Sequence, residues 1–149
     1  MTLTALIEAL EKAEGPSEKL DLEIWRLTRA TSFAPDAQEL GVWHNGASRY
    51  VSFHTGFTKK ERREKNCDSL LRYTSSIDAA LTLIPEGALW DVEYKINVGP
   101  LFVVPDGEPE KKYSAHLFVG APPSTEIDGH HFTSAPMALC IAALRARDK

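Results

Sequence analysis

The chain has 149 residues, of which 43% are hydrophobic and 26% charged, a composition typical of one folded globular domain and unlike that of disordered chains. Its formal net charge is -4, so we expect no general nucleic-acid binding, which usually depends on an excess of basic residues. No apolar run approaches the roughly 20 residues that a membrane-spanning helix needs, and the acidic, amphipathic first 15 residues lack the pattern of a secretory signal.

The two cysteines, Cys67 and Cys140, are far apart in the sequence, and neither belongs to a C-x-x-C motif. Two isolated thiols indicate a reducing compartment, so we expect a cytoplasmic protein. Cys140 falls on the apolar face of the last predicted helix and is expected to be buried as a small hydrophobic residue. Cys67 follows a charged run and is expected to be exposed.

Residues 1–30 predict two short helices joined by a tight break, which together form a helical hairpin. The apolar residues of the first helix recur at helical spacing: Leu3, Leu6, Ile7 and Leu10. Gly15 and Pro16 end this helix, because glycine suits the position after a helix and proline cannot continue it. Ser17 is a favourable N-cap for the second helix, whose apolar residues are Leu20, Ile24 and Leu27.

The next segment, 31–72, gives weaker patterns. Asn45-Gly46 is a turn dipeptide, and the apolar residues on either side of it, 42–43 and 50–53, predict the arms of a β-hairpin. The run Lys59–Lys65 holds five basic residues against two glutamates. The stretch "TKKERREKNCDS" is therefore expected to form a solvated loop or a frayed helical turn, and the alternative interpretation of its basic residues is a clamp for an anion.

Residues 73–149 predict a helix, a block of strands and a second helix. Ser75 and Asp78 resemble a capping box, and helical spacing follows at Ile77, Ala80, Leu81 and Ile84. The sequence then predicts three strands of an antiparallel meander. The first has Trp90, Val92, Tyr94 and Ile96 on its apolar face, the second is the short apolar run at 101–105, and the third begins at Tyr113. Residues 121–133 are expected to form a long loop. The last helix is predicted to begin near Ser134, with the apolar stripe Met137, Cys140, Ile141 and Leu144.

These elements predict an α+β fold in which both alanine-rich helices cover part of one small, largely antiparallel sheet. We expect a single domain over 1–149, with a helical hairpin in 1–30, a variable and inserted segment in 31–72, and a helix–strands–helix core in 73–149. A sheet of few strands leaves edges to cover, so we also expect a homodimer or a higher oligomer.

The phrases "YTSSIDAALTLIPEGALWDVEY" and "TSAPMALCIAALRARDK" resemble the phage ABA sandwich domain family of small phage and prophage proteins. The similarity extends from about Tyr73 to Ala146, and the opening "LTALIEALEKAEGPSEKLD" also looks like this family. The resemblance implies an α/β/α sandwich and an origin in an infected bacterial host. It supplies no reaction and no functional residues, because the matched phrases are capping and core positions.

The sequence contains no phosphate-binding glycine loop, dinucleotide fingerprint or nucleophile elbow. His116 is expected on the polar face of its strand as a surface or packed histidine. The adjacent pair His130-His131 precedes a helix, but neighbouring side chains point apart in an extended chain, so we expect no metal site. No catalytic residues and no cofactor are expected.

A site for a small phosphorylated ligand fits the remaining residues better. The loop 129–134 leads into a helix N-terminus, where free N–H groups favour phosphate, and aromatic rings can stack a base. Trp90 and Tyr94 are among these rings, although the core is their more usual place. The candidate ligand-binding residues are Lys59, Lys60, Arg62, Arg63, Trp43, His130, His131, Thr133 and Ser134.

Three functions of different classes follow. The first is a non-catalytic phage accessory protein that counters host defence by sequestering a nucleotide-derived immune signal. The second is a protein–protein interaction module, either a virion or morphogenesis factor or a direct inhibitor of a host protein. The third is a hydrolase or nuclease that uses the histidines, but nothing pairs a nucleophile with a base, so we expect a protein that is not an enzyme.

Overall fold

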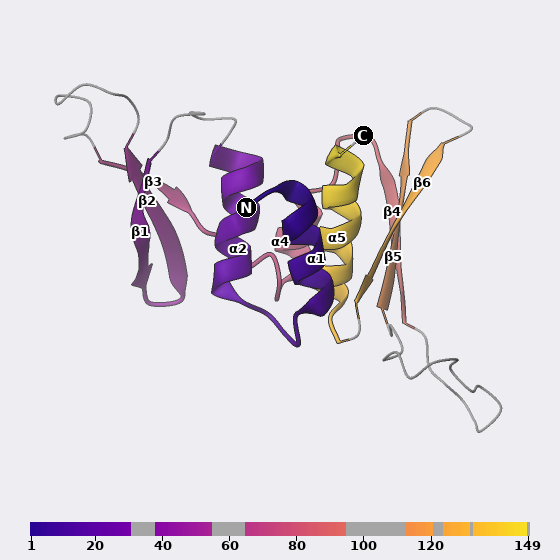
Figure 1. Ribbon diagram of the computed structural model, residues 1–149, viewed down its shortest axis with the longest axis horizontal. Coiled ribbons are helices and arrows are strands. Elements are labelled where there is room, and N and C mark those ends of the chain that lie inside the picture. Colours follow the sequence, from indigo (N-terminus) through magenta and orange to yellow (C-terminus); the bar gives the residue numbers. More distant parts are fainter. Residues whose placement is uncertain (31–37, 55–64, 95–112, 121–123, 132, 149) are drawn as a thin grey trace.

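Helices lie between two small antiparallel sheets in the computed structural model of the protein (Figure 1). The structure describes residues 1–30, 38–54, 65–94, 113–120, 124–131 and 133–148. Its α+β architecture, with antiparallel sheets, short helices and an N-terminal helical pair, confirms the fold class predicted from the sequence. The strands divide between two sheets, however, where one had been expected.

The N-terminal helical pair follows its local sequence closely. Helix α1 spans Leu3–Lys12 and is capped by the Thr2 side chain. Of the apolar residues predicted for its core-facing side, Leu6, Ile7 and Leu10 are buried and Leu3 is partly buried. Helix α2 spans Glu18–Trp25 and continues into a wider turn, η1, over Arg26–Ala30. Ser17 occupies the N-cap position as predicted, but its side chain makes no capping hydrogen bond. Its backbone N–H instead donates to the Thr74 hydroxyl at 3.0 Å, which ties the start of α2 to the segment before α4.

The first sheet is a meander of β1 (Gln38–Asn45), β2 (Ser48–His54) and β3 (Lys65–Ser69). The predicted hairpin is confirmed: β1 and β2 pair across a two-residue turn in which Gly46 has a φ of 59°, a conformation that favours glycine. The loop or helical turn predicted at 65–69 is wrong, because these residues form β3. Their sequence has no apolar alternation. The strand is specified by pairing with β2, which a local pattern does not contain.

The second sheet is a meander of β4 (Leu89–Tyr94), β5 (Tyr113–Val119) and β6 (Thr125–His131). The strands predicted from Trp90 and from Tyr113 are confirmed as far as Tyr94 and Val119, whereas Ile96 and the strand predicted at 101–105 lie outside the described residues. The long loop predicted for 121–133 is wrong over 125–131. Strand β6 escaped detection because its core-facing positions are Ile127, Gly129 and His131. Only one of these is a large apolar residue, so the alternation that marks a half-buried strand is hidden.

Helix α5 (Ala135–Arg147) begins at the predicted place, with the Ser134 hydroxyl accepting from the backbone N–H of Met137. Its predicted apolar stripe is too narrow, since every residue from Met137 to Leu144 is buried. The helix is covered on two sides, by β5 and β6 on one and by α1 and α4 on the other (Figure 1). Among the described helices, none is both long and apolar enough to span a bilayer.

Helix α4 (Ile77–Leu81) is shorter than predicted and lies elsewhere. Its N-cap is Ser76 rather than Ser75, and it packs against α5 instead of covering a sheet. Ile77, expected on the buried stripe, is exposed, and the buried residues are Ala79, Ala80 and Leu83. The buried face is displaced by one residue from the predicted stripe, because α5 contacts the side of the helix that carries Ala79, Ala80 and Leu83.

Strand β4 is largely uncovered by described residues. Trp90 and Tyr94, for which the core was the more usual expectation, are 45% and 51% exposed. Helix α5 covers β5 and β6. The apolar side chains of β4 alternate as predicted, but they stay exposed because α5 packs on the two neighbouring strands instead. The cysteines behave as expected, with Cys140 buried and Cys67 exposed.

We predict that Gly129→Ala destabilises the protein strongly. A Cβ at Gly129 would overlap the Ala138 carbonyl oxygen and the Ala142 backbone nitrogen of α5, so the helix and the sheet would have to separate. Overpacking of this kind costs about 1–3 kcal/mol or more. The measurement is urea unfolding, with Gly15→Ala as the matched control, since a Cβ at Gly15 meets nothing within 4 Å. Equal stability of the two variants would contradict this packing.

Candidate functional site

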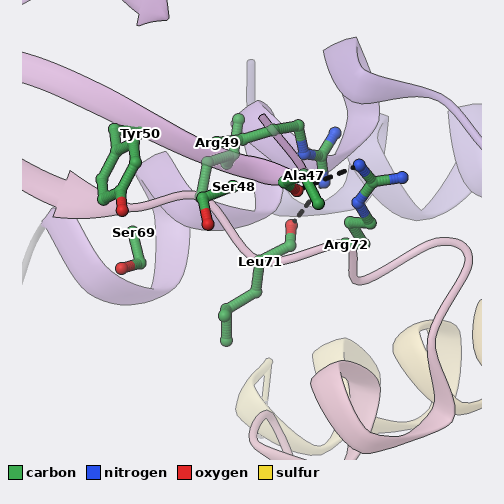
Figure 2. A pocket seen from close by; sticks show the side chains of 8 residues that line it. Ala47, Ser48, Arg49, Tyr50, Ser69, Leu71 and Arg72 are labelled. Atoms are coloured by element: carbon green, nitrogen blue, oxygen red, sulfur yellow. Dashed lines mark hydrogen bonds between the residues drawn. The ribbon is translucent and has the colours of Figure 1, made fainter. Parts of the chain in front are cut away.

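A pocket of about 250 Å³ lies where the β1–β2 turn meets the end of β3 (Figure 2). The Leu70 N–H donates to the Arg49 carbonyl at 2.9 Å, which extends the β2–β3 pairing to the floor of the pocket. Two stretches of four residues line it: Ala47, Ser48, Arg49 and Tyr50 from the turn and β2, and Ser69, Leu70, Leu71 and Arg72 from the end of β3 and the residues after it. The lining holds two arginines and three hydroxyl side chains, and it holds no carboxylate, histidine or thiol.

The two arginines differ in burial and in partners. Arg72 is exposed and donates one hydrogen bond, to the Ala47 carbonyl at 3.2 Å; within the described ranges it pairs with no carboxylate. Arg49 is 9% exposed and donates to Asp21 at 2.7 Å and to the Leu71 carbonyl at 3.0 Å. Its Nε is buried and has no hydrogen-bond partner among the described atoms.

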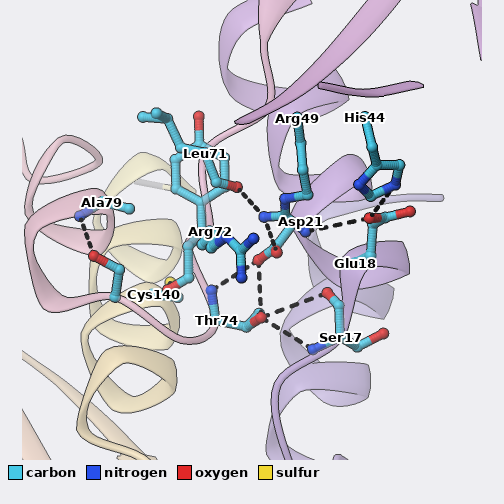
Figure 3. Close-up of polar contacts among 12 residues, drawn as sticks. Ser17, Glu18, Asp21, His44, Arg49, Leu71, Arg72, Thr74, Ala79 and Cys140 are labelled. Carbon is cyan, nitrogen blue, oxygen red and sulfur yellow. Dashed lines mark hydrogen bonds and ion pairs between the residues drawn. The ribbon is translucent and has the colours of Figure 1, made fainter. Parts of the chain in front are cut away.

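Arg49 is held by a buried polar network between α2 and the segment before α4 (Figure 3). The Asp21 carboxylate accepts from Arg49 and from both the backbone N–H and the hydroxyl of Thr74, each of the latter at 2.8 Å. Glu18 lies 3.5 Å from the guanidinium and 3.1 Å from His44. These carboxylates compensate the charge of Arg49 inside the protein, so the cation that a ligand would neutralise is Arg72.

An aromatic pair extends from the pocket over the outer face of the first sheet. Tyr50, which lines the pocket, stacks on Trp43 with ring centroids 4.6 Å apart and an interplanar angle of 19°. Trp43 and Tyr50 are register partners on β1 and β2, so their side chains share one face. Trp43 is exposed and presents ring surface beside the pocket.

Three of the predicted site residues lie together at the start of α5, but their polar groups are used within the protein. His131 is buried; its Nε2–H donates to the Ala13 carbonyl at 3.0 Å, and its Nδ1 accepts from the N–H groups of Thr133 and Ser134 at 3.2 and 3.1 Å. The Thr133 hydroxyl donates to the Glu14 carbonyl at 3.2 Å. The arrangement fastens the α5 N-terminus to the link between α1 and α2.

The other predicted residues lie apart from this group. His130 is on the opposite face of β6, with its Nδ1 2.9 Å from the Ser114 hydroxyl, and Trp43 is in the first sheet. The basic residues Lys59, Lys60, Arg62 and Arg63 lie outside the described residues.

Sequence reasoning missed both arginines of the pocket. Arg49, Val51 and Phe53 alternate on β2 and are all buried, so Arg49 stands at a core-facing position of a predicted strand. A charge in that place requires a buried partner, which is the clue that could have identified it. Arg72 carries no such clue, because its place depends on how the chain leaves β3.

Comparison of the chain with protein-family models, with curated proteins and with solved structures finds no match. Function therefore has to be inferred from the described side chains. A pocket lined by guanidinium and hydroxyl donors is suited to holding an anion.

We predict that acid destabilises the protein through His131. Burial lowers the pKa of this histidine below its ordinary value of 6.5, so the unfolded chain binds the proton more readily than the native protein does. The free energy of unfolding therefore falls as the pH drops below about 6.5. Urea unfolding between pH 7.5 and 5 measures this slope.

The His131→Gln variant should be less stable by about 1–3 kcal/mol at pH 7.5 and should lose most of the slope. Both proteins carry His116→Gln, because the pKa of His116 is raised and this histidine therefore stabilises the protein at low pH. Its contribution, present below pH 6.5 and lost as the pH rises, would otherwise oppose the slope due to His131. A slope that is unchanged in His131→Gln would assign the acid sensitivity to other groups.

Proposed function

We propose that this protein is a non-catalytic binding protein that holds a small phosphorylated ligand in the pocket between Arg49 and Arg72. The observation that carries the proposal is the exposed guanidinium of Arg72, which pairs with no described carboxylate and lines a pocket together with Arg49 and three hydroxyl side chains. Guanidinium groups bind phosphate through short, charge-assisted hydrogen bonds.

The size of the pocket favours a phosphate group with a small attached part. Its volume of about 250 Å³ is below the range of roughly 300–1,000 Å³ that encloses whole drug-sized ligands. The remainder of a larger ligand would extend over Tyr50 and the exposed ring of Trp43, where a base can stack. A nucleotide derivative combines both parts, a phosphate for the arginines and a base for the aromatic pair.

The biological role that we propose is sequestration of a nucleotide-derived immune signal by a phage or prophage accessory protein. The support for this role is the sequence resemblance of residues 73–146 to a family of small phage proteins, together with a pocket that offers binding groups and no general base. A protein of this kind acts stoichiometrically, so its effect depends on affinity and on its concentration relative to the signal.

A second candidate function, the protein-interaction module, is favoured by strand β4. Among the described residues this strand has no partner on one edge, and its exposed apolar side chains include Leu89, Trp90 and Tyr94. Trp90 and Tyr94 share one face of the strand, and Leu89 lies on the other face with Asp91 and Glu93. A partner strand with apolar residues on one face and basic residues on the other would complement it by β-addition.

We predict that Arg72→Gln weakens the binding of pyrophosphate and of ADP-ribose by tenfold or more, because a hydrogen bond from a charged donor contributes about 1.5–3 kcal/mol. Isothermal titration calorimetry measures both affinities. The control is Arg147→Gln, which removes another exposed arginine whose described bond is to a backbone carbonyl. Trp43→Ala should weaken ADP-ribose and leave pyrophosphate unchanged. Failure of the unaltered protein to bind either probe, or equal binding by Arg72→Gln, would contradict the proposal.

For the interaction module, we predict that Trp90→Lys prevents a basic, strand-forming polypeptide of the infected host from co-purifying with the protein. A lysine on the apolar face of an edge strand opposes further pairing. The matched control is Ser124→Lys, which adds the same charge at an exposed position before β6. Capture of the same polypeptide by both variants would exclude β4 as the interaction surface.

A further inference from the structure

The outward face of the second sheet, which is turned away from α5, collects acidic side chains around a histidine. On β5, His116 is the register partner of Asp91 on β4 and of Asp128 on β6. Glu126, two residues before Asp128, lies on the same face of β6, and Glu93 lies on the same face of β4. Alternation within the strands places all five side chains on this side of the sheet.

Three of these side chains converge at one point. The Nδ1 of His116 lies 2.8 Å from an Asp128 oxygen and 3.3 Å from a Glu126 oxygen. One ligand atom from each of the three residues lies within 4.8 Å of the others. Direct register pairing fixes the histidine and the aspartate, and the glutamate reaches them along the diagonal of the same strand pair.

We propose that His116, Glu126 and Asp128 bind a divalent transition-metal ion, for which Zn²⁺ is the best fit. Zinc–nitrogen and zinc–oxygen bonds of about 2.0–2.2 Å in a tetrahedral site place the ligand atoms roughly 3.4 Å apart. The distance between His116 and Glu126 already has this value, and the one between His116 and Asp128 needs to widen by only about half an ångström.

The charge of this face favours a cation. Four carboxylates, those of Asp91, Glu93, Glu126 and Asp128, surround His116, and no lysine or arginine lies on the described part of the face. Like charges on neighbouring strands repel one another, and a divalent ion would relieve that repulsion. The imidazole nitrogen directs the site toward zinc and similar metals, because magnesium and calcium prefer oxygen ligands alone.

Three protein ligands leave at least one coordination position for water, since both carboxylates are exposed. The site is independent of the proposed ligand pocket, because the two sheets lie on opposite sides of the helices (Figure 1). The function proposed for the Arg49–Arg72 pocket could therefore fail while this site binds its ion, and the reverse also holds.

Binding of the ion requires His116 to lose its proton. An Asp128 oxygen lies 2.8 Å from the Nδ1 that would hold the ion, and Asp91 and Glu93 lie on the same side of the sheet. Glu126 faces the same nitrogen. Metal binding should consequently release protons and weaken as the pH falls.

The test is calorimetric titration of tag-free protein with Zn²⁺, in a Cys67→Ser background that removes the exposed thiol. We expect one ion per chain, proton release that depends on pH, and an affinity reduced roughly tenfold or more in both His116→Gln and Asp128→Asn. The matched control is His44→Gln, which removes a histidine paired with a single carboxylate, Glu18, and should leave the affinity unchanged.

Co²⁺ gives a second measurement, since its visible absorption bands report ligand identity and tetrahedral geometry. These bands should be present in the Cys67→Ser protein and absent in the folded His116→Gln variant, with folding verified by circular dichroism. Absence of binding, or binding that survives both substitutions at His116 and Asp128, would overturn the proposal.

Discussion

The buried ion pair between Asp21 and Arg49 is the constraint on which the placement of the first sheet depends. Both side chains are almost completely buried, and removal of two charges from water costs several kcal/mol per ion. The pair is tolerated because Asp21 also accepts two hydrogen bonds from Thr74, while Arg49 also donates to the Leu71 carbonyl. Three segments that are distant in the sequence therefore meet at one carboxylate, and a single fixed arrangement satisfies it. Asp68 reinforces this placement, because it accepts from the Trp25 indole at 2.7 Å and from Arg29 at 2.9 Å.

The pocket is a consequence of this pair. Arg49 can enter the core from β2 only if its guanidinium reaches Asp21, and that direction leaves its Nε without an acceptor. The same geometry draws Leu71 to Arg49 and Arg72 to the Ala47 carbonyl, which places a second guanidinium beside the first. An arrangement that stabilises the fold thus also assembles the donors to which we assign the phosphorylated ligand, with Arg72 as the charge that no described carboxylate compensates.

The features that the sequence predicts well are those set by near neighbours along the chain. The Ser134 cap, the hairpin turn at Gly46 and the apolar side of α1 each depend on a few adjacent residues. The cap and the hairpin are confirmed, and so is the apolar side of α1 at Leu6, Ile7 and Leu10. Strands β3 and β6 depend on pairing partners, and the exposure of Trp90 depends on which strands α5 covers. His131 was expected near a ligand, but its hydrogen bonds are made within the protein. Polar residues are common at helix starts both as structural caps and as ligand-binding groups, so the sequence alone does not distinguish the two roles. Arg49 was missed because its partner is 28 residues away.

The small residues of α5 explain how the second sheet is held. Gly129 lies against the backbone of α5 at Ala138 and Ala142, so β6 approaches the helix more closely than any side chain would allow. The same glycine is the register partner of Ala115 on β5, and the next pair along the two strands is His116 with Asp128. A change that pushes β6 away from α5 would therefore act on the separation of these two side chains as well as on stability. Close packing on the inner face of the sheet is thus what fixes the ligand distances on its outer face, and the alanines of α5, which carry no chemistry themselves, position residues that do.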